Sequence, residues 1–260
     1  MCIAYLAFQA HDDWPLFLAA NRDEFHARPA RVAAPWVDHP HVIAGIDEVA
    51  GGTWLGVTRQ GRFAVLTNYR DLRLAGPANP ASRGELVKQF LTGNSPAPAY
   101  ASHVAQQGRN FAGFNLIVGD MTSAVYTGNE HPQAQTAHAL TPGRYVVSNH
   151  LLDTAWPKTE RLRLVLNNFP LDHLERSINQ VFELLRDTTQ APDEDLPQTG
   201  LSLEKERLLS SPFIISPDYG TRCSTIVAIH KSGKALFSEL TYDRQGQPLE
   251  RHDWPWQLEA

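Results

Sequence analysis

The stretch that decides the fold is MCIAYLAFQAHDDWPLFLAANRDE, residues 1–24. Residues 3–8 form an apolar, β-prone run, residues 9–14 supply a turn, and residues 16–20 return as a second apolar run. We therefore predict an antiparallel hairpin. The polar residues 21–24 end its second strand, so they are expected to lie close to residue 2.

Cys2 is the residue of this hairpin with the clearest chemical use. A small side chain at position 2 permits removal of Met1, which would leave a thiol and a free α-amine on one residue. The amine titrates at about 7.7–8.0 and the thiol at about 8.5, so a single residue can hold nucleophile and base. Taken alone, a cysteine near a chain start is more typical of a small buried hydrophobe. The rest of the chain must decide between the two.

Length and composition indicate one large domain over residues 1–260, with a formal net charge of −5 and with acids and bases interspersed. This balance argues against nucleic acid or an anionic membrane as a partner. No apolar run approaches the roughly 18 residues of a membrane span, and no secretory leader is present. We therefore expect a soluble, cytoplasmic protein, and the sequence leaves its oligomeric state open.

Strand patterns dominate the two ends of the chain, and helical patterns lie between them. Apolar runs separated by glycine turns predict a short strand at residues 41–46 and further hairpins at residues 51–68, 114–127 and 225–240. Apolar residues at helical spacing predict helices at residues 84–91, 99–107, 158–166 and 171–186. Ser82 and Glu85 predict a capping box for the first helix. The pattern indicates an α+β layered domain dominated by antiparallel sheet.

Residues 190–200 are polar, acidic and proline-containing, so we predict a mobile surface loop there, with a composition compatible with a lid. The tightest histidine cluster, residues 38–41, has a proline between its histidines, and the chain has no CxxC or HExxH motif. We therefore predict neither a metal site nor a cofactor.

Five polar residues stand at the ends of apolar strand runs: Asn21, Asp23, Asn68, Asn149 and Arg222. Such ends lie at a sheet edge, where several together would line one pocket. Asparagine amides can donate to a developing oxyanion, an aspartate can orient the amine or the thiol, and an arginine can favour thiolate. Any one asparagine is more typical of a turn, so the prediction depends on the joint pattern.

A set of ordered motifs runs along almost the whole chain: Met1-Cys2, Asn21-Arg22-Asp23-Glu24-Phe25, Arg28-Pro29, residues 51–56, Leu66-Thr67-Asn68-Tyr69-Arg70, Ser82-Arg83-Gly84, Phe114-Asn115-Leu116, Ser148-Asn149, Trp156-Pro157-Lys158-Thr159 and Thr221-Arg222-Cys223-Ser224-Thr225. Each motif is weak alone, but their order is specific. The chain resembles the NRDE family, which includes the eukaryotic transport and Golgi organisation protein homologues.

That family in turn resembles the cysteine branch of the N-terminal-nucleophile hydrolases. The resemblance implies a four-layer αββα sandwich of two antiparallel sheets and hydrolysis of a linear amide through an acyl-enzyme. It implies Cys2 as the nucleophile, Asp23 as the residue that holds it in place, and Arg222 as the late pocket arginine. Asn68 and Asn149 match the two asparagines near the oxyanion.

The substrate-binding candidates are Asn21, Arg22, Trp54 and Tyr69. Trp54 is compatible with a pocket wall, although tryptophan is more often a core or edge residue.

One departure concerns Arg22. The cysteine acylases carry Arg-Asn-x-Asp at the end of the second strand, whereas Ala20 occupies the arginine position here. Strand alternation puts Asn21 and Asp23 on one face and Arg22 on the other, so either the strand ends before Arg22 or Arg22 has a different role. The same alternation directs Cys223 away from a pocket that contains Arg222, so we expect no Cys2–Cys223 disulfide.

Two functions therefore stay open. The first is an amidase that acts on a linear amide or N-acyl compound through Cys2. The second is a non-catalytic binding or trafficking protein on the same scaffold, with a hydrophobic ligand such as haem or an acyl lipid.

Overall fold

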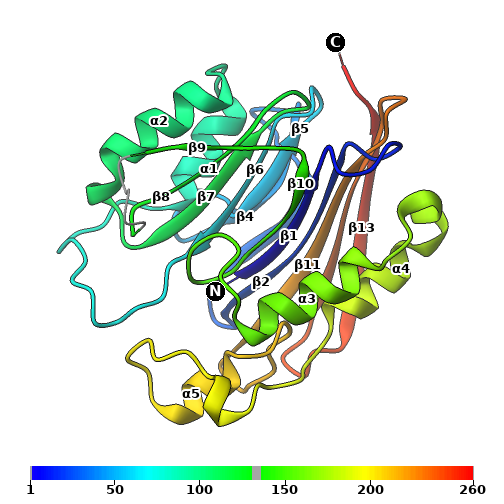
Figure 1. The fold of residues 1–260 in the computed structure, drawn as a ribbon. Coiled ribbons are helices and arrows are strands. Elements are labelled where there is room, and N and C mark those ends of the chain that lie inside the picture. Colours follow the sequence, from blue (N-terminus) through cyan, green and yellow to red (C-terminus); the bar gives the residue numbers. More distant parts are fainter. Residues whose placement is uncertain (1, 131–135, 260) are drawn as a thin grey trace.

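Two antiparallel sheets lie face to face in the computed structural model, which describes residues 2–130 and 136–259 (Figure 1). The six-stranded sheet has the order β10-β1-β2-β11-β12-β13. Its strands in chain order are β1 Cys2–Phe8, β2 Leu16–Phe25, β10 Gly143–Val147, β11 Tyr219–Ile229, β12 Lys234–Tyr242 and β13 Pro248–Gln257. The predicted opening hairpin is thus confirmed as β1 and β2, near the middle of this sheet.

The second sheet has seven strands, and each pairs with its neighbour in the sequence. They are β3 Ala30–Pro35, β4 Val42–Asp47, β5 Leu55–Thr58, β6 Phe63–Asn68, β7 Phe114–Gly119, β8 Ala124–Gly128 and β9 His138–Leu140. Gly61 adopts a left-handed φ of +83° in the β5–β6 turn, a conformation that glycine adopts without strain.

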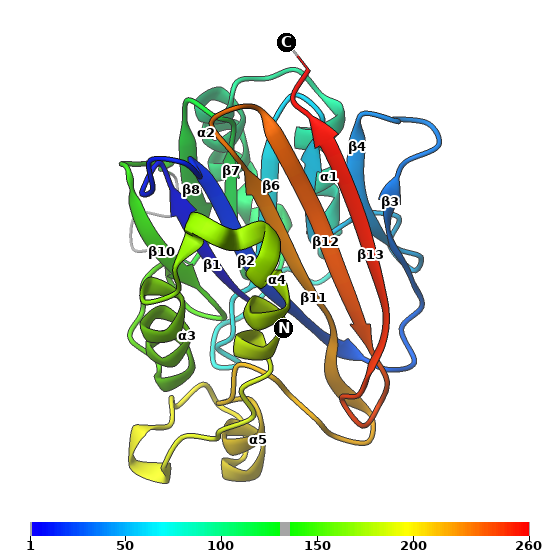
Figure 2. The same ribbon diagram turned by 90° about the vertical axis from the view of Figure 1, so that its right-hand side faces the viewer.

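Helices cover the outer face of each sheet (Figure 2). Helices α1 (Gly84–Thr92) and α2 (Ala97–Gln107) lie on the seven-stranded sheet. Helices α3 (Pro157–Asn167) and α4 (Leu174–Leu185) lie on the six-stranded sheet. A short helix α5 (Leu203–Leu208) and the 3₁₀ turns Gly108–Asn110, Leu171–His173 and Asp193–Asp195 complete the described helical segments.

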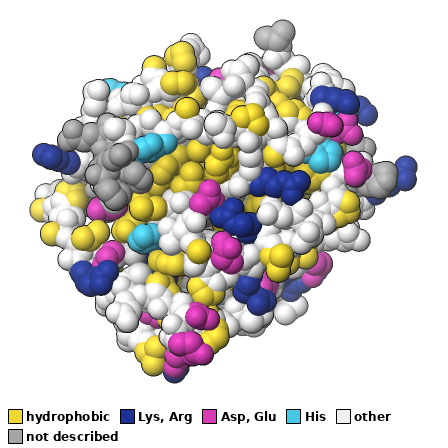
Figure 3. All heavy atoms as spheres, viewed as in Figure 1, with side chains coloured by type: hydrophobic (Ala, Val, Ile, Leu, Met, Phe, Trp, Pro, Cys, Tyr) yellow, Lys and Arg dark blue, Asp and Glu magenta, His cyan; other side chains and the backbone are white. Residues whose placement is uncertain are grey.

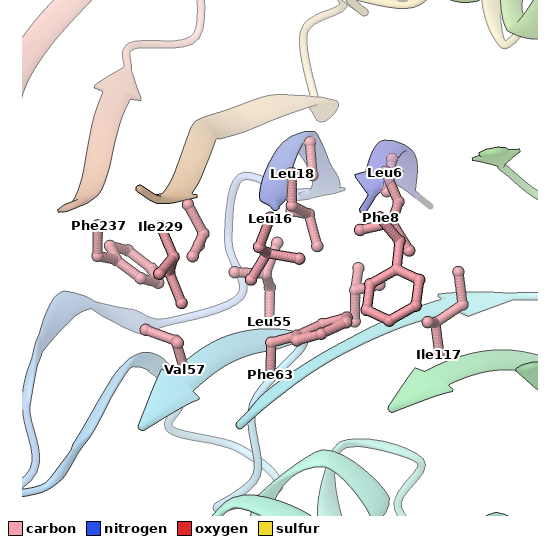
Figure 4. Packing of buried hydrophobic residues seen from close by; sticks show 14 of the residues in the cluster. Leu6, Phe8, Leu16, Leu18, Leu55, Val57, Phe63, Ile117, Ile229 and Phe237 are labelled. Carbon is pink, nitrogen blue, oxygen red and sulfur yellow. The ribbon is translucent and has the colours of Figure 1, made fainter. Parts of the chain in front are cut away.

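Successive side chains of the central strands are buried on opposite faces of the sheet, one set between the two sheets and the other under the helices. Leu6 and Phe8 of β1 point between the sheets toward Phe63 and Ile117 (Figure 4), whereas Tyr5 packs on the helix side. Strands buried on both faces read as continuous apolar runs, as residues 3–8 and 16–20 do. The four-layer αββα sandwich expected from the family resemblance is confirmed.

Two details of the sequence prediction were wrong. No capping box opens α1: the residue at its cap is Arg83, and no side chain caps the helix. The predicted helix 171–186 is a 3₁₀ turn followed by α4. The second strand, whose end the sequence left open, continues to Phe25.

Strands β3, β9 and β13 were missed, and each lies at the edge of a sheet. Edge strands tolerate charge and proline, which hide the strand pattern.

The loop at residues 190–200, expected to be mobile, is tied down by several hydrogen bonds. The main-chain N–H and the hydroxyl of Thr199 donate to Glu206 Oε1 at 2.8 and 2.6 Å, and the Leu72 N–H donates to the Thr199 carbonyl at 2.8 Å. Near the other end, Arg207 pairs with Asp193. The structure therefore places this segment against residues 70–73 and α5.

The surface is mixed in charge. On the face shown in Figure 3, Lys and Arg side chains are interspersed with Asp and Glu. In the described part of the chain, no helix is both long and apolar enough to cross a membrane.

Candidate active site

The pairing of β1 with β2 places Cys2 opposite Arg22. Ala4 and Ala20 pair two residues further along and face the space between the sheets, so Cys2 and Arg22 share this inner side. Cys2 is half-buried at the very start of β1. Met1, whose removal the small side chain at position 2 permits, lies outside the described residues.

A cavity of about 530 Å³ opens at this end of the sandwich. The six-stranded sheet contributes Cys2, Arg22 and Asp23 to its wall, and the seven-stranded sheet contributes Asn68. Trp54, just before β5, and Arg83, at the cap of α1, also line it. The cavity therefore brings together residues that are far apart in the sequence.

Burial dominates the acid–base properties of the thiol. Desolvation raises the pKa of Cys2, the negative charge of Asp23 raises it further, and Arg22 lowers it. Asp23 is itself buried, which raises the pKa of its carboxyl, although it accepts a hydrogen bond from Thr221 Oγ1 at 2.6 Å. In this state Cys2 favours the thiol form, so attack by its sulfur requires a base.

The structure shows whether the second strand ends before Arg22, which the sequence left open. Strand β2 continues past it, and Arg22 lines the cavity whereas Asn21 does not; at this end of the strand Asp23 also forms part of the wall. Its guanidinium carbon lies 4.2 Å from the centroid of the Trp54 ring, and its Nη2 lies 4.0 Å from Glu24 Oε2. Arg22 and Trp54 thus form one wall, with a cation over an aromatic face.

Asn21 projects to the other side of the sheet. Its amide donates to the carbonyls of Leu185 and Pro212 at 2.8 and 2.9 Å, and its oxygen accepts from Ser224 Oγ at 2.6 Å. The structure thus places this predicted substrate-binding residue outside the cavity lining, where it anchors the end of α4.

The two asparagines matched to the oxyanion are in contact, but they occupy different positions. Asn149 Nδ2 donates to Asn68 Oδ1 at 3.1 Å. Asn68 lines the cavity, whereas Asn149 is fully buried behind it and accepts a hydrogen bond from Lys158 Nζ at 2.8 Å. Of the pair, Asn68 is the one that lies in the cavity wall.

Ser148 fixes the main chain of the thiol residue. Its hydroxyl donates to the Cys2 carbonyl at 2.9 Å, and its own carbonyl accepts from Thr67 Oγ1 and from Asn115 Nδ2, the latter at 3.3 Å. These bonds join β1, the end of β10, β6 and β7. In the sequence, Ser148 and Asn115 belong to motifs of the family, but no role was predicted for either residue.

Arg222 and Tyr69 lie outside the cavity lining. Arg222 sits at an irregularity of β11, where the pairing register shifts. Its Nη1 donates at 3.0–3.3 Å to three main-chain carbonyls, one at the end of β2 and two in the connection that follows. The Tyr69 ring lies 5.0 Å from the His150 ring. Cys223 is buried and, like Cys2, is a free thiol.

Two glycines, Gly52 and Gly84, also line the cavity. A Cβ built on Gly52 would lie 2.4 Å from the Gly84 carbonyl carbon, and the Thr53 N–H donates to the Gly84 carbonyl at 3.2 Å. The segment before β5 therefore touches the start of α1 directly. This close approach explains why glycine stands at both positions.

Among residues 2–130 and 136–259, no three His, Cys, Asp or Glu side chains are grouped so that they could hold a metal ion.

Comparison with known proteins gives matches of two kinds. The family model described as "Transport and Golgi organisation 2" matches residues 1–244. The Transport and Golgi organization protein 2 homologs of Bos taurus and Homo sapiens are 36% and 34% identical, each over 92% of this chain and 92% of the relative. Among solved structures, a mutant of the conjugated bile acid hydrolase of Clostridium perfringens is similar in fold, with a TM-score of 0.50 and 8% identity over 99% of this chain and 97% of that one.

Proposed function

The chain belongs to the Transport and Golgi organisation 2 family, and from that premise we propose that it is an N-terminal-nucleophile amidohydrolase that cleaves a linear amide through Cys2. One observation carries the proposal: Cys2 lines a cavity of about 530 Å³ together with Arg22 and the Asn68 carboxamide. The fold neighbour supports the scaffold, because it is by name a conjugated bile acid hydrolase.

The chemistry begins once removal of Met1 frees the α-amine of Cys2. The sulfur attacks the amide carbonyl carbon, a C–S bond forms, and the thiol proton passes to the α-amine. The resulting oxyanion accepts a hydrogen bond from Asn68 Nδ2. The C–N bond then breaks, and the leaving amine takes the proton from the ammonium group. Water, with the α-amine again as base, hydrolyses the thioester and releases the acid.

The neighbours of Cys2 have separate roles in this scheme. Arg22 offsets part of the desolvation that raises the pKa of Cys2. Asp23, buried beside the thiol residue, orients the new α-amine. Asn149 and Arg222 act indirectly, since the first holds Asn68 and the second holds the main chain after β2.

A second candidate function is favoured by the raised pKa of Cys2, which is unhelpful in a nucleophile. The cavity wall also includes Phe25, which is 59% exposed, and three arginines, Arg22, Arg28 and Arg83, of which Arg22 lies near Glu24 and Arg28 is paired with Asp47. An apolar molecule with an anionic group, such as an acyl lipid or haem, would suit such a wall. In that case the chain binds and carries its ligand without chemistry.

Alkylation of the thiol separates the two functions. The untagged chain and an N-terminally extended chain are treated with iodoacetamide near neutral pH and followed by intact mass. We expect the untagged chain to lack Met1 and to label once at Cys2, faster than the extended chain, because the free amine on the same residue lowers the pKa of the thiol.

Two variants serve as controls. Cys2→Ala should lose the label and Cys223→Ser should keep it, since Cys223 is buried. Retained Met1, or equal rates in the two chains, would reject the hydrolase and favour the carrier. Titration of the same chain with haemin and with a fluorescent fatty acid would then identify the ligand class.

A further inference from the structure

Lys158 is the most unusual charged residue outside the cavity lining. It is the second residue of α3, it is 2% exposed, and its Nζ lies 5.9 Å from the centroid of the Trp156 ring. Lysine is almost never fully buried without a partner. Its hydrogen-bond partner in the structure is Asn149 Oδ1, at 2.8 Å. A buried lysine held behind a candidate active site calls for an explanation.

The bond from Lys158 determines which way the Asn149 amide faces. A carboxamide has one acceptor end and one donor end, whereas a lysine ammonium group can only donate. Lys158 Nζ donates to Asn149 Oδ1 at 2.8 Å. The Nδ2 end must therefore face the other way, where it donates to Asn68 Oδ1 at 3.1 Å.

The orientation of the Asn149 amide in turn determines the orientation of the Asn68 carboxamide. Because Asn68 Oδ1 is occupied by Asn149, the donor end of Asn68 is Nδ2, and its other hydrogen bond is a long one of 3.4 Å to the Tyr69 carbonyl. Asn68 lines the cavity. A carboxamide flipped end for end would present an acceptor at the same place and would repel an oxyanion.

We propose that Lys158 is a positioning residue which, through Asn149, fixes the Asn68 carboxamide with its N–H end available to the oxyanion. This inference deepens the proposed function and rests on it, since it presupposes an oxyanion at Asn68. Lys158 itself touches neither the thiol nor the substrate in this scheme. Its role is to remove the freedom of two amides to flip.

The protonation state of Lys158 determines how strictly it orients Asn149. The charged and titratable groups that act on it are Arg70, Asp23, Cys2 and Glu206. Burial, followed by the charge of Arg70, lowers the pKa of Lys158 to about 7. Below this pH the ammonium group can only donate to Asn149 Oδ1. Above it the neutral amine still carries N–H donors for the same bond, but its lone pair also makes it an acceptor, so it orients the amide less strictly.

Two reagents that attack the same thiol provide the test. p-Nitrophenyl acetate acylates Cys2 through a tetrahedral oxyanion, whereas iodoacetamide alkylates it by displacement and forms no oxyanion. We expect Asn68→Ala to slow acylation by about 10²–10³, the usual effect of losing one oxyanion donor. Lys158→Met should slow acylation at least about tenfold, and both variants should be alkylated within about twofold of the wild-type rate.

Two further variants separate positioning from a general loss of structure. Lys158→Gln keeps an N–H donor without the charge, so it should recover most of the acylation rate. In an Asn149→Ala background, Lys158→Met should have no additional effect, because residues that act through one another are not additive.

The other outcomes overturn either the positioning role or the proposed function. Normal acylation in Lys158→Met with slow acylation in Asn68→Ala would reject the positioning role and leave the hydrolase intact. Equal slowing of both reagents in Lys158→Met and in Lys158→Gln would also reject it, because the thiol itself would then be affected. If wild-type acylation does not depend on Cys2, the proposed function fails, and the inference fails with it.

Discussion

At the scale of single residues, the balance between burial and Arg22 decides how reactive Cys2 is. Arg22 lies opposite Cys2 across the β1–β2 pair and lowers the pKa of a thiol that burial has raised. Arg22→Met should therefore raise that pKa further and slow alkylation near neutral pH, by about tenfold for each unit of pKa. The measurement is the rate of iodoacetamide labelling between pH 6 and about 10.

The matched control is Arg28→Met. Arg28 also lines the cavity, but its Nη2 is paired with Asp47 Oδ2 at 2.8 Å, so the labelling profile of Cys2 should not move. Identical profiles for the wild type and Arg22→Met would show that Arg22 has no influence on the thiol.

Lys158 makes the stability of the fold depend on pH. Its pKa is about 7 in the folded chain, against an ordinary value of 10.5. Between these values the unfolded chain holds a proton that the folded chain lacks, so stability rises with pH, and the full cost of burial applies below pH 7. The free energy of unfolding should rise by up to about 1.4 kcal/mol per pH unit relative to Lys158→Met.

Urea denaturation at pH 6, 7, 8 and about 9 measures this difference. Lys88→Met is the control: the Lys88 side chain is 38% exposed, so the free energy of unfolding of this variant should change with pH as that of the wild type does. A difference between the wild type and Lys158→Met that is constant over this range would contradict the lowered pKa.

At the scale of elements, the contact between the segment before β5 and the start of α1 forms one wall of the cavity. Gly52→Ala would place a Cβ 2.4 Å from the Gly84 carbonyl carbon, so α1 or the segment must shift. We expect a loss of about 1–3 kcal/mol, as for other overpacked sites, and slower acylation of Cys2. Gly76→Ala, which meets nothing within 4 Å, is the control for thermal melting. Equal melting temperatures would show that the contact is not tight.

Helix α5 is held to the segment after β6 by a buried ion pair. Arg70 Nη2 lies 3.1 Å from Glu206 Oε2, and both side chains are at most 5% exposed. Removing one partner of a buried pair typically costs about 3–5 kcal/mol. Glu206 also holds Thr199, so Glu206→Gln should expose residues 190–200 to protease. The exposed Glu204→Gln should not, and equal cleavage of both variants would contradict this anchoring role.

At the scale of the whole molecule, the sequence predicted the fold better than the site. The strands at residues 3–8 and 16–20 were predicted correctly because strands that are buried on both faces consist of long apolar runs. The four-layer arrangement came from the family resemblance, not from periodicity. The edge strand β13 was missed because it contains proline and charged residues, which an edge strand tolerates and which interrupt the apolar alternation expected of a strand.

Only the part of the site that the opening hairpin forms could be predicted from the sequence. The place of Cys2 beside Arg22 follows from strand pairing. The burial of Asn149 behind Asn68, and of Lys158 behind both, depends on how α3 packs across the end of β10, which no local pattern encodes. Lys158 stood in a recognised motif, but a lysine in an amphipathic helix is usually exposed, so nothing in the spacing indicated a buried one.

The most direct test of the central claim is to map the product of a short reaction between the untagged chain and p-nitrophenyl acetate. The proposed hydrolase should yield an N-terminal peptide that begins at Cys2 and carries one acetyl group, which stays on sulfur when the sample is kept acidic and cannot move to the α-amine. This group should disappear with turnover, should be missing in Cys2→Ala and should persist in Cys223→Ser. A peptide that retains Met1, or acetylation that Cys2→Ala leaves unchanged, would contradict the proposal that Cys2 is the nucleophile.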